Sequence, residues 1–110
     1  MRAARLRRSR EIANVRSGGR SLRRAAFAAR VLRTELSGPR IAVTATRSLG
    51  RAVQRNRARR RVREAFRVAL ADHRDIGGVD VVVSVRPASS ASDFRVLVTE
   101  AATLLREAAQ

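Results

Sequence analysis

Arginine side chains are the groups in this 110-residue sequence whose type and spacing point to a particular chemistry. Between Val53 and Asp72 there is no glycine or proline, so this segment favours a helix. Within it Arg55, Arg59 and Arg63 recur every fourth residue, a spacing that places them on one ridge of a helix. A guanidinium group stays ionised and donates paired hydrogen bonds, which suits it to a phosphate. Further basic side chains surround the ridge: Arg57, Arg60, Arg61 and Arg67.

Such a ridge is unfavourable by itself, because each pair of like charges one turn apart costs roughly a few tenths of a kcal/mol. The rest of the chain adds to the repulsion, since all 25 basic residues are arginine and the net charge is +16. Residues 1–67 hold 21 arginines and three glutamates, whereas residues 68–110 hold four arginines and six acidic residues. A solubilising surface does not need this excess, so the charge indicates a polyanionic partner.

Nucleic acid is the first candidate for that partner, and an anionic membrane is the second. Helices that lie on membranes use large aromatic side chains, and this sequence has no tryptophan and no tyrosine. No apolar run approaches the roughly 18 residues of a membrane span. We therefore expect a nucleic-acid partner and no membrane.

Groups for catalysis or metal binding are scarce in the sequence. There is no cysteine and one histidine, His73, which excludes thiolate zinc sites, cysteine nucleophiles and sites with several histidines. Asp72, Asp75 and Asp80 lie near one another in the sequence, but they offer too few oxygen ligands for a metal. We predict no catalytic residue and no metal site in this chain.

Hydrophobic periodicity predicts the elements that must position the arginines. A first helix is expected to begin with Ser9 as its N-cap and to end at Gly18-Gly19, after a flexible basic tail over residues 1–8. Alternation predicts strand over residues 21–34, in two pieces. The remaining elements are a strand over residues 40–46, the arginine helix over 53–72, a strand over 79–85 and a last helix that begins at Ser92 or Asp93.

This order of elements indicates an α+β fold in which helices cover a mixed sheet. The strands over residues 40–46 and 79–85 flank the arginine helix, so we predict that they are parallel neighbours. No linker divides the chain, and residues 1–110 are predicted to form a single domain. The apolar face of the arginine helix is expected in the core: Ala58, Val62, Ala65, Phe66, Ala69 and Leu70.

The segment from Gly50 to Arg67, GRAVQRNRARRRVREAFR, resembles the signature of the bacterial ribonuclease P protein subunit. That signature has a Gly-x-Ala-Val lead, an Arg-Asn-Arg core and a basic helix that ends in Arg-Glu-x-Phe. An arginine-rich helix is common, but this ordered set is specific. Further similarities cover nearly the whole chain: Arg5-Leu6-Arg7, Gly19-Arg20-Ser21, Ile41 to Thr46, Asp80 to Pro87 and Asp93-Phe94.

The resemblance implies an αβββαβα fold with a four-stranded mixed sheet, similar to a ribosomal-protein-like domain, and with a left-handed βαβ crossover around the arginine helix. It also implies an accessory subunit of an endoribonuclease, ribonuclease P, which hydrolyses one phosphodiester bond of precursor tRNA to give the mature 5′ end. The RNA subunit of that enzyme carries the active site and its Mg²⁺. The implied partners are therefore this RNA and precursor tRNA, with no obligate protein partner, in the bacterial cytoplasm.

The resemblance also assigns residues to two surfaces. The family holds the 5′ leader of the precursor in a cleft between the first helix and the sheet, where aromatic side chains commonly stack on bases. The corresponding leader-binding set here is Ile12, Arg16, Phe27 and Arg30, with Phe27 also a candidate for the core. Because three of these replace aromatic residues, we expect guanidinium groups to hold the leader with less discrimination between bases. The RNA subunit is expected to contact Arg55, Asn56, Arg57, Arg59, Arg60, Arg63 and Arg67.

Two other function classes stay open on the sequence. One is a ribosomal or general RNA-binding protein without a catalytic RNA partner, and the other is a basic nuclease that acts alone. A nuclease of that kind cuts precursor tRNA unaided, whereas a simple binder never cuts it, even with the RNA subunit present.

Overall fold

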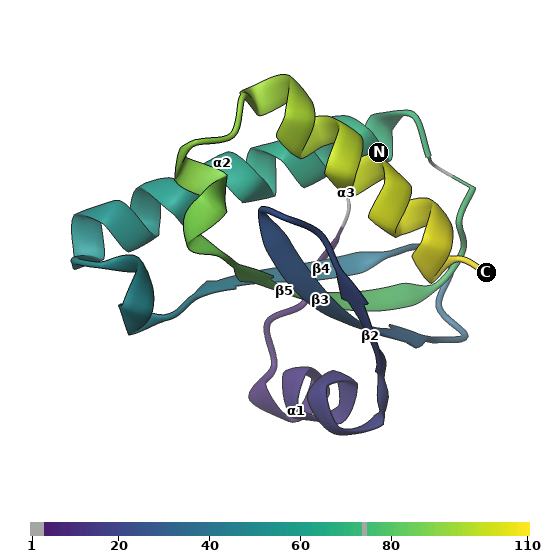
Figure 1. Cartoon of the computed structure of the whole chain (residues 1–110). Coiled ribbons are helices and arrows are strands. Elements are labelled where there is room, and N and C mark those ends of the chain that lie inside the picture. Colours follow the sequence, from purple (N-terminus) through teal and green to yellow (C-terminus); the bar gives the residue numbers. More distant parts are fainter. Residues whose placement is uncertain (1–3, 74) are drawn as a thin grey trace.

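The computed structural model describes residues 4–73 and 75–110 of the chain (Figure 1). The strands are β1 (Ala4–Arg5), β2 (Arg20–Arg23), β3 (Phe27–Arg33), β4 (Arg40–Ala45) and β5 (Val79–Val85). The helices are α1 (Ser9–Gly18), α2 (Ala52–Ala71) and α3 (Phe94–Ala108), with two 3-10 turns, η1 (Arg47–Leu49) and η2 (Pro87–Ser90). The predicted α+β class and the order αβββαβα are confirmed, and the two-residue strand β1 adds to the predicted four-stranded sheet.

The sheet has the strand order β1-β4-β5-β3-β2. Strand β3 runs antiparallel to both β5 and β2, whereas β4 is parallel to β5 and to β1. The prediction that the two strands flanking the arginine helix are parallel neighbours is therefore confirmed, since α2 connects β4 to β5. The hand of this crossover stays a prediction.

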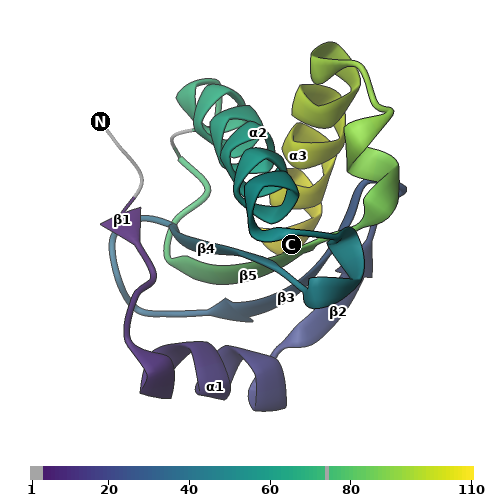
Figure 2. The same ribbon diagram turned by 90° about the vertical axis from the view of Figure 1, so that its left-hand side faces the viewer.

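Helices cover both faces of the sheet, with α2 and α3 on one face and α1 on the other (Figures 1 and 2). Strand β5 lies in the middle and is buried on both faces, which explains its run of valines. Val81 and Val83 point toward α2 and α3, whereas Val82 points toward α1. The alternation along each strand therefore decides which helix layer a side chain meets.

The larger core lies between the sheet and the layer of α2 and α3. Phe27 of β3 and Phe66 of α2 are wholly buried there, and their ring centroids are 5.2 Å apart. The predicted apolar face of the arginine helix is confirmed, because Val62, Ala65, Phe66, Ala69 and Leu70 are all buried and Ala58 is half-buried at its edge. This face fixes the orientation of α2 and so decides which arginines reach solvent.

A smaller core under α1 consists of Leu6, Val15 and Val82. The backbone N–H of Leu6 donates to the carbonyl oxygen of Ile41 at 3.0 Å, and Leu6 is 3% exposed. The prediction of a flexible basic tail is thus wrong for residues 4–6, because β1 satisfies the open edge of β4 and Leu6 buries its side chain. Residues 1–3 lie outside the described residues.

The start of α1 differs from the prediction by one residue. Arg8 occupies the N-cap position and Ser9 is the first helical residue, because the carbonyl oxygen of Arg8 accepts the first helical hydrogen bond, from the N–H of Ile12 at 3.0 Å. Asp93 holds the N-cap position of α3, one of the two positions predicted.

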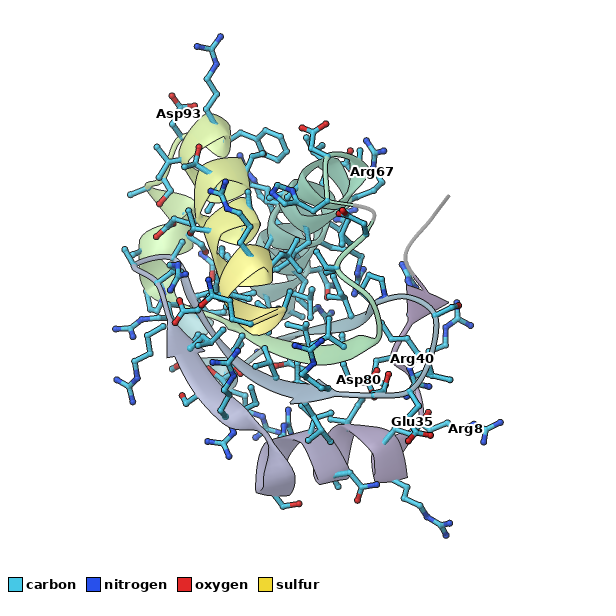
Figure 3. The ribbon with its side chains drawn as sticks, turned by 90° about the vertical axis from the view of Figure 1, so that its right-hand side faces the viewer. Arg8, Glu35, Arg40, Arg67, Asp80 and Asp93 are labelled. Atoms are coloured by element: carbon cyan, nitrogen blue, oxygen red, sulfur yellow. The ribbon has the colours of Figure 1, made fainter. Side chains whose placement is uncertain are left out.

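An ion-pair network ties α1 to the sheet through Arg40 at the start of β4 (Figure 3). The guanidinium of Arg40 donates to both carboxylate oxygens of Asp80, at 2.8 and 2.6 Å, and to Glu11 of α1 at 2.6 Å. Arg40 and Asp80 face each other across β4 and β5, so the sheet register itself brings this pair together. Hydrogen bonds to Asp80 and then to Glu11 raise the pKa of Arg40 further above its usual range.

Removing the cation of this network should destabilise the fold. In Arg40→Met the side chain of Asp80, 6% exposed, would be left as a buried charge without its partner. We expect the free energy of unfolding to fall by about 3 kcal/mol, measured by chemical denaturation. The matched control is Arg67→Met, which breaks an exposed pair with Glu64 and should leave the unfolding curve unchanged. Equal stability of the two variants would contradict a structural role for the network.

Candidate RNA interface

The start of α2 is shaped by a turn that needs glycine. Gly50 has φ +111°, and a Cβ placed there would lie 2.1 Å from Oε1 of Gln54. That oxygen instead accepts a hydrogen bond from the backbone N–H of Arg51 at 2.8 Å, and the carbonyl oxygen of Gly50 accepts one from Arg55 at 2.8 Å. The turn therefore sets where the helix begins and holds the first arginine of the predicted ridge at its end.

Four of the predicted RNA-contact residues line one shallow depression, which we call the α2 hollow: Asn56, Arg59, Arg60 and Arg63. Its volume is about 400 Å³. Arg59 donates a hydrogen bond to the amide oxygen of Asn56, which orients the guanidinium along the helix. Among the described residues, none of the three arginines of the hollow forms an ion pair with a carboxylate. The hollow is therefore a surface of uncompensated positive charge.

The pKa of Arg63 also reflects the positive charge of the hollow. Partial burial lowers the pKa of Arg63, and the positive charges of Arg5 and Arg59 lower it further. A guanidinium stays protonated under all ordinary conditions, so the direction of the shift reflects partial burial first and repulsion from Arg5 and Arg59 second. An anion bound between these groups would relieve that repulsion.

The remaining predicted contacts on α2 lie outside the hollow. Arg55 is half-buried against the turn at Gly50, and Arg57 is exposed on another side of the helix. Arg67 is exposed and pairs with Glu64, one turn earlier, at 2.5 Å. The structure thus brings four of the seven predicted residues together and leaves three apart.

Arg61 has a structural role that its sequence position did not reveal. Its guanidinium donates to the carbonyl oxygens of Ser89 and Ser92, both at 2.8 Å, and so ties α2 to η2 and the start of α3. Residues two positions apart on a helix differ by about 200° in direction, so Arg61 points away from both Arg59 and Arg63. The α2 hollow therefore lies on the flank of α2 that faces away from α3.

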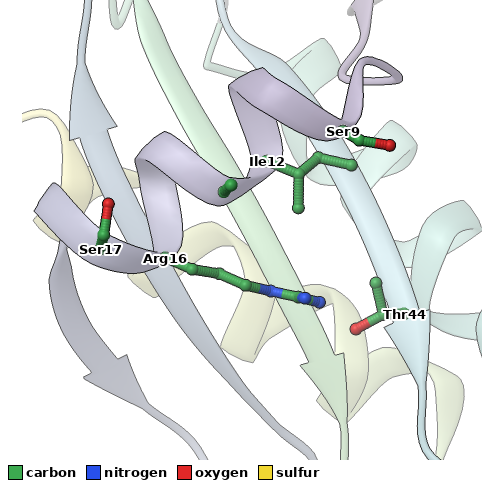
Figure 4. A pocket seen from close by; sticks show the side chains of 6 residues that line it. Ser9, Ile12, Arg16, Ser17 and Thr44 are labelled. Atoms are coloured by element: carbon green, nitrogen blue, oxygen red, sulfur yellow. The ribbon is translucent and has the colours of Figure 1, made fainter.

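A second surface lies on the opposite face of the sheet, in an open groove of about 540 Å³ beside α1. Six residues line this groove, which we call the α1 groove: Ser9, Ile12, Ala13, Arg16, Ser17 and Thr44. The side chain of Arg16 extends from α1 across the sheet toward Thr44 of β4 (Figure 4). Ile12 and Arg16, two of the four predicted leader-binding residues, are therefore brought together here.

The other two predicted leader-binding residues are separated by the pleat of β3. Arg30 lies on the α1 side of the sheet, as does Leu32 two positions later. Arg30 is half-buried, and its Nε has no hydrogen-bond partner among the residues that the structure describes. Phe27 lies on the other side, where it is wholly buried against Phe66. The assignment of Phe27 to leader binding is corrected: the odd-numbered residues of β3 point into the core, so this ring is not available to a ligand.

Four lining residues of the groove were not predicted, Ser9, Ala13, Ser17 and Thr44, and Thr44 is the one that the sheet contributes. The alternation that buries Ile41 and Val43 turns Thr44 to the α1 side, and this was the available signal. In register with Thr44 lie Ser84 of β5 and Ala28 of β3, so small side chains form this part of the sheet surface.

Several arginines outside α2 serve the fold instead of a ligand. Arg24 pairs with Glu107 of α3 at 2.9 Å and donates to the hydroxyl of Thr103 at 3.0 Å. Arg20 and Arg33 donate to backbone carbonyl oxygens at the carboxyl end of α3. These contacts use positive charge to hold α3 on strands β2 and β3.

Two further properties concern membranes and metals. Over residues 4–73 and 75–110, no helix combines the length and the apolar character needed to cross a membrane. Across the same ranges, no three side chains of His, Cys, Asp or Glu gather in a way that could hold a metal ion.

The fold and the α2 hollow together define a small α+β protein with a polycationic helix packed on a mixed sheet. Comparison with known proteins identifies its family. The family described as Ribonuclease P matches residues 1–109, and the chain belongs to this family. The Ribonuclease P protein component of Gluconacetobacter diazotrophicus is 38% identical over 108 residues, which are 97% of this chain and 92% of the relative. That of Chloroflexus aggregans is 40% identical over 108 residues, 97% of this chain and 78% of the relative.

Solved structures agree with this assignment. The RNase P protein from Thermotoga maritima superposes with a TM-score of 0.79 at 28% identity and covers 94% of this chain and 96% of its own. The RNase P protein of Staphylococcus aureus has a TM-score of 0.77 at 19% identity, over 96% of this chain and 95% of its own, and it supports the fold alone. The family name supports RNA binding and tRNA processing for this chain.

The structure separates arginines that hold the fold from arginines that face a ligand, and stability measurements can check this. Arg61→Ala removes two hydrogen bonds from a charged, half-buried donor, so we expect the free energy of unfolding to fall by about 2 kcal/mol. Arg60→Ala, the adjacent exposed position, serves as the control and should leave stability unchanged. A stability loss for Arg60→Ala as large as that for Arg61→Ala would show that the separation is wrong.

Proposed function

We propose that this chain is the protein subunit of ribonuclease P, which binds the catalytic RNA through α2 and the 5′ leader of precursor tRNA in the α1 groove. In this role it assists the endonucleolytic removal of the leader, and the mature 5′ end of tRNA results. The observation that carries the proposal is the α2 hollow, because its uncompensated arginines coincide with the motif through which the chain resembles the family.

The physical task is electrostatic. A folded catalytic RNA and a precursor tRNA both carry dense negative charge, and each guanidinium that replaces condensed counterions contributes favourable free energy to their association. Groups already held on a helix lose little conformational freedom when they bind, so α2 presents them at low entropic cost. The side-chain amide oxygen of Asn56 accepts a hydrogen bond from Arg59 and keeps its guanidinium oriented. The amide nitrogen of Asn56 offers a further donor to a base or a phosphate.

The chemistry of bond cleavage belongs to the RNA subunit in this proposal. Mg²⁺ supplies charge stabilisation and an activated water in phosphodiester hydrolysis, and we place that ion with the RNA. Within residues 4–73 and 75–110, no three side chains of His, Cys, Asp or Glu gather in a way that could hold a metal ion. The proposed partners are the RNA subunit and precursor tRNA, with no obligate protein partner, and the proposed location is the cytoplasm of a bacterium.

Reconstitution with labelled precursor tRNA tests the function. The isolated chain should leave the precursor uncut, whereas the chain together with the ribonuclease P RNA and Mg²⁺ should release the leader. The double variant Arg59→Ala, Arg63→Ala should weaken assembly with the RNA and reduce the slope of log affinity against log salt by roughly 1.5. Cleavage by the chain alone would identify a self-sufficient nuclease. Failure to increase cleavage in the presence of the RNA would favour a general RNA-binding protein.

The α1 groove is proposed to hold the leader with charge in place of aromatic stacking. None of its six lining residues is aromatic, and Arg16 spans the groove while Arg30 lies on the same side of the sheet. A guanidinium plane can stack on any base and pair with any phosphate, so this surface favours unpaired RNA of many sequences.

Separate affinity measurements on precursor and mature tRNA test the groove. Arg16→Ala together with Arg30→Ala should weaken binding of the holoenzyme to precursor tRNA by about thirtyfold, since each of the two lost stacking or phosphate contacts is worth roughly 1 kcal/mol. Mature tRNA has no leader, so its affinity should not change. The matched control Arg95→Ala, an exposed arginine on α3, should alter neither affinity. An equal loss for both tRNAs would place the two arginines outside a leader site.

A further inference from the structure

We infer that β1 carries an additional RNA-contact residue, Arg5, which extends the surface of the α2 hollow onto the edge of the sheet, and that the buried side chain of Leu6 holds it there. This inference rests on the proposed function and adds a contact outside α2. Composition predicts a flexible basic tail for this part of the chain, so the placement of Arg5 is a result of the tertiary structure.

The register of β1 decides where Arg5 points. Arg5 is aligned with Ile41 of the parallel strand β4, and aligned residues on neighbouring strands project to the same face of a sheet. Ile41 is part of the core on the side of α2 and α3. Arg5 therefore projects from the sheet edge on the face that α2 covers. Figure 2 shows β1 at the edge of the sheet beside β4 and α2 above the sheet.

Leu6 projects to the opposite face and acts as the anchor. It is 3% exposed, it packs with Val15 of α1 and Val82 of β5, and its backbone N–H donates to the carbonyl oxygen of Ile41. A strand of two residues has little pairing of its own, so burial of this one leucine side chain contributes most of what orders β1. The anchor places the preceding guanidinium at a defined position.

The positive charge of Arg5 also acts on an arginine of the α2 hollow. Arg5 is exposed, and its positive charge is one of the groups that lower the pKa of Arg63, together with that of Arg59. Within the described residues, no carboxylate forms an ion pair with Arg5. Cations held close without counter-charges bind a shared polyanion more strongly than scattered ones. The chemical class of ligand is therefore a phosphodiester backbone that runs from α2 to the β1 edge.

The test measures the affinity of the full chain for the ribonuclease P RNA over a series of salt concentrations. Arg5→Ala should weaken binding about threefold to tenfold and reduce the slope of log affinity against log salt by roughly one, because one phosphate contact is lost. The matched control Arg95→Ala removes the same charge from the exposed surface of α3 and should change neither quantity. Both replaced side chains are exposed, so both variants are expected to fold like the unmodified chain.

Leu6→Ala tests the anchor, because it keeps every charge. We expect it to weaken binding about as much as Arg5→Ala, and the double variant should be little weaker than either single variant, since both remove the same contact. A loss in Leu6→Ala that adds fully to that of Arg5→Ala would overturn the anchoring role.

Failure of the inference is distinguishable from failure of the proposed function. If Arg5→Ala behaves like Arg95→Ala while Arg63→Ala weakens binding and lowers the salt slope, Arg5 is not a contact and the proposed function stands. If the unmodified chain binds the ribonuclease P RNA no more tightly than an unrelated RNA of equal length, the proposed function fails and the inference fails with it.

Discussion

Repulsion among guanidinium groups is the constraint on which the rest of this structure depends. The chain has 25 arginines and nine acidic residues, so most of its positive charge has no carboxylate to pair with. Two half-buried arginines are compensated by carboxylates: Arg40 lies between two of them beneath α1, and Arg24 pairs with one on α3. Arg61 is compensated by backbone carbonyl oxygens instead. Part of the charge that remains lines the α2 hollow and the α1 groove, where an external polyanion can neutralise it.

The sheet is the element that keeps these two charged surfaces apart. Because β5 is buried on both faces, the α2 hollow and the α1 groove are separated by a packed layer that cannot deform easily. Strand β4 contributes to both sides, since Val43 packs under α2 and Thr44 lines the groove. Under the proposed function, an RNA assembly that contacts both surfaces passes around the edge formed by β1 and β4. The RNA contact inferred for Arg5 on that edge gives a physical reason for an ordered β1 in this short chain.

Local patterns were sufficient for most of the fold and failed where a long-range contact decides the outcome. The valine run over 79–85 and the apolar face of α2 are periodic, and periodicity is a property of neighbouring residues. The alternation of β3 also predicts two faces, but not which face meets α1. On the sequence Phe27 therefore fits both the leader surface and the core, and in the structure it lies in the core. Leu6 stands among arginines, so composition predicts a disordered tail, although the open edge of β4 and a small apolar site under α1 order it.

The amino-acid sequence alone determined the family, the order of the elements and the concentration of arginine on one helix, because motif, periodicity and charge are all local properties of the chain. The tertiary structure decided what each arginine does. Arg59 and Arg61 are two positions apart and chemically identical, yet one lines an open hollow and the other is fastened to η2, since the apolar face of α2 docks in only one orientation. That orientation depends on contacts between segments far apart in the sequence, and no local pattern contains it.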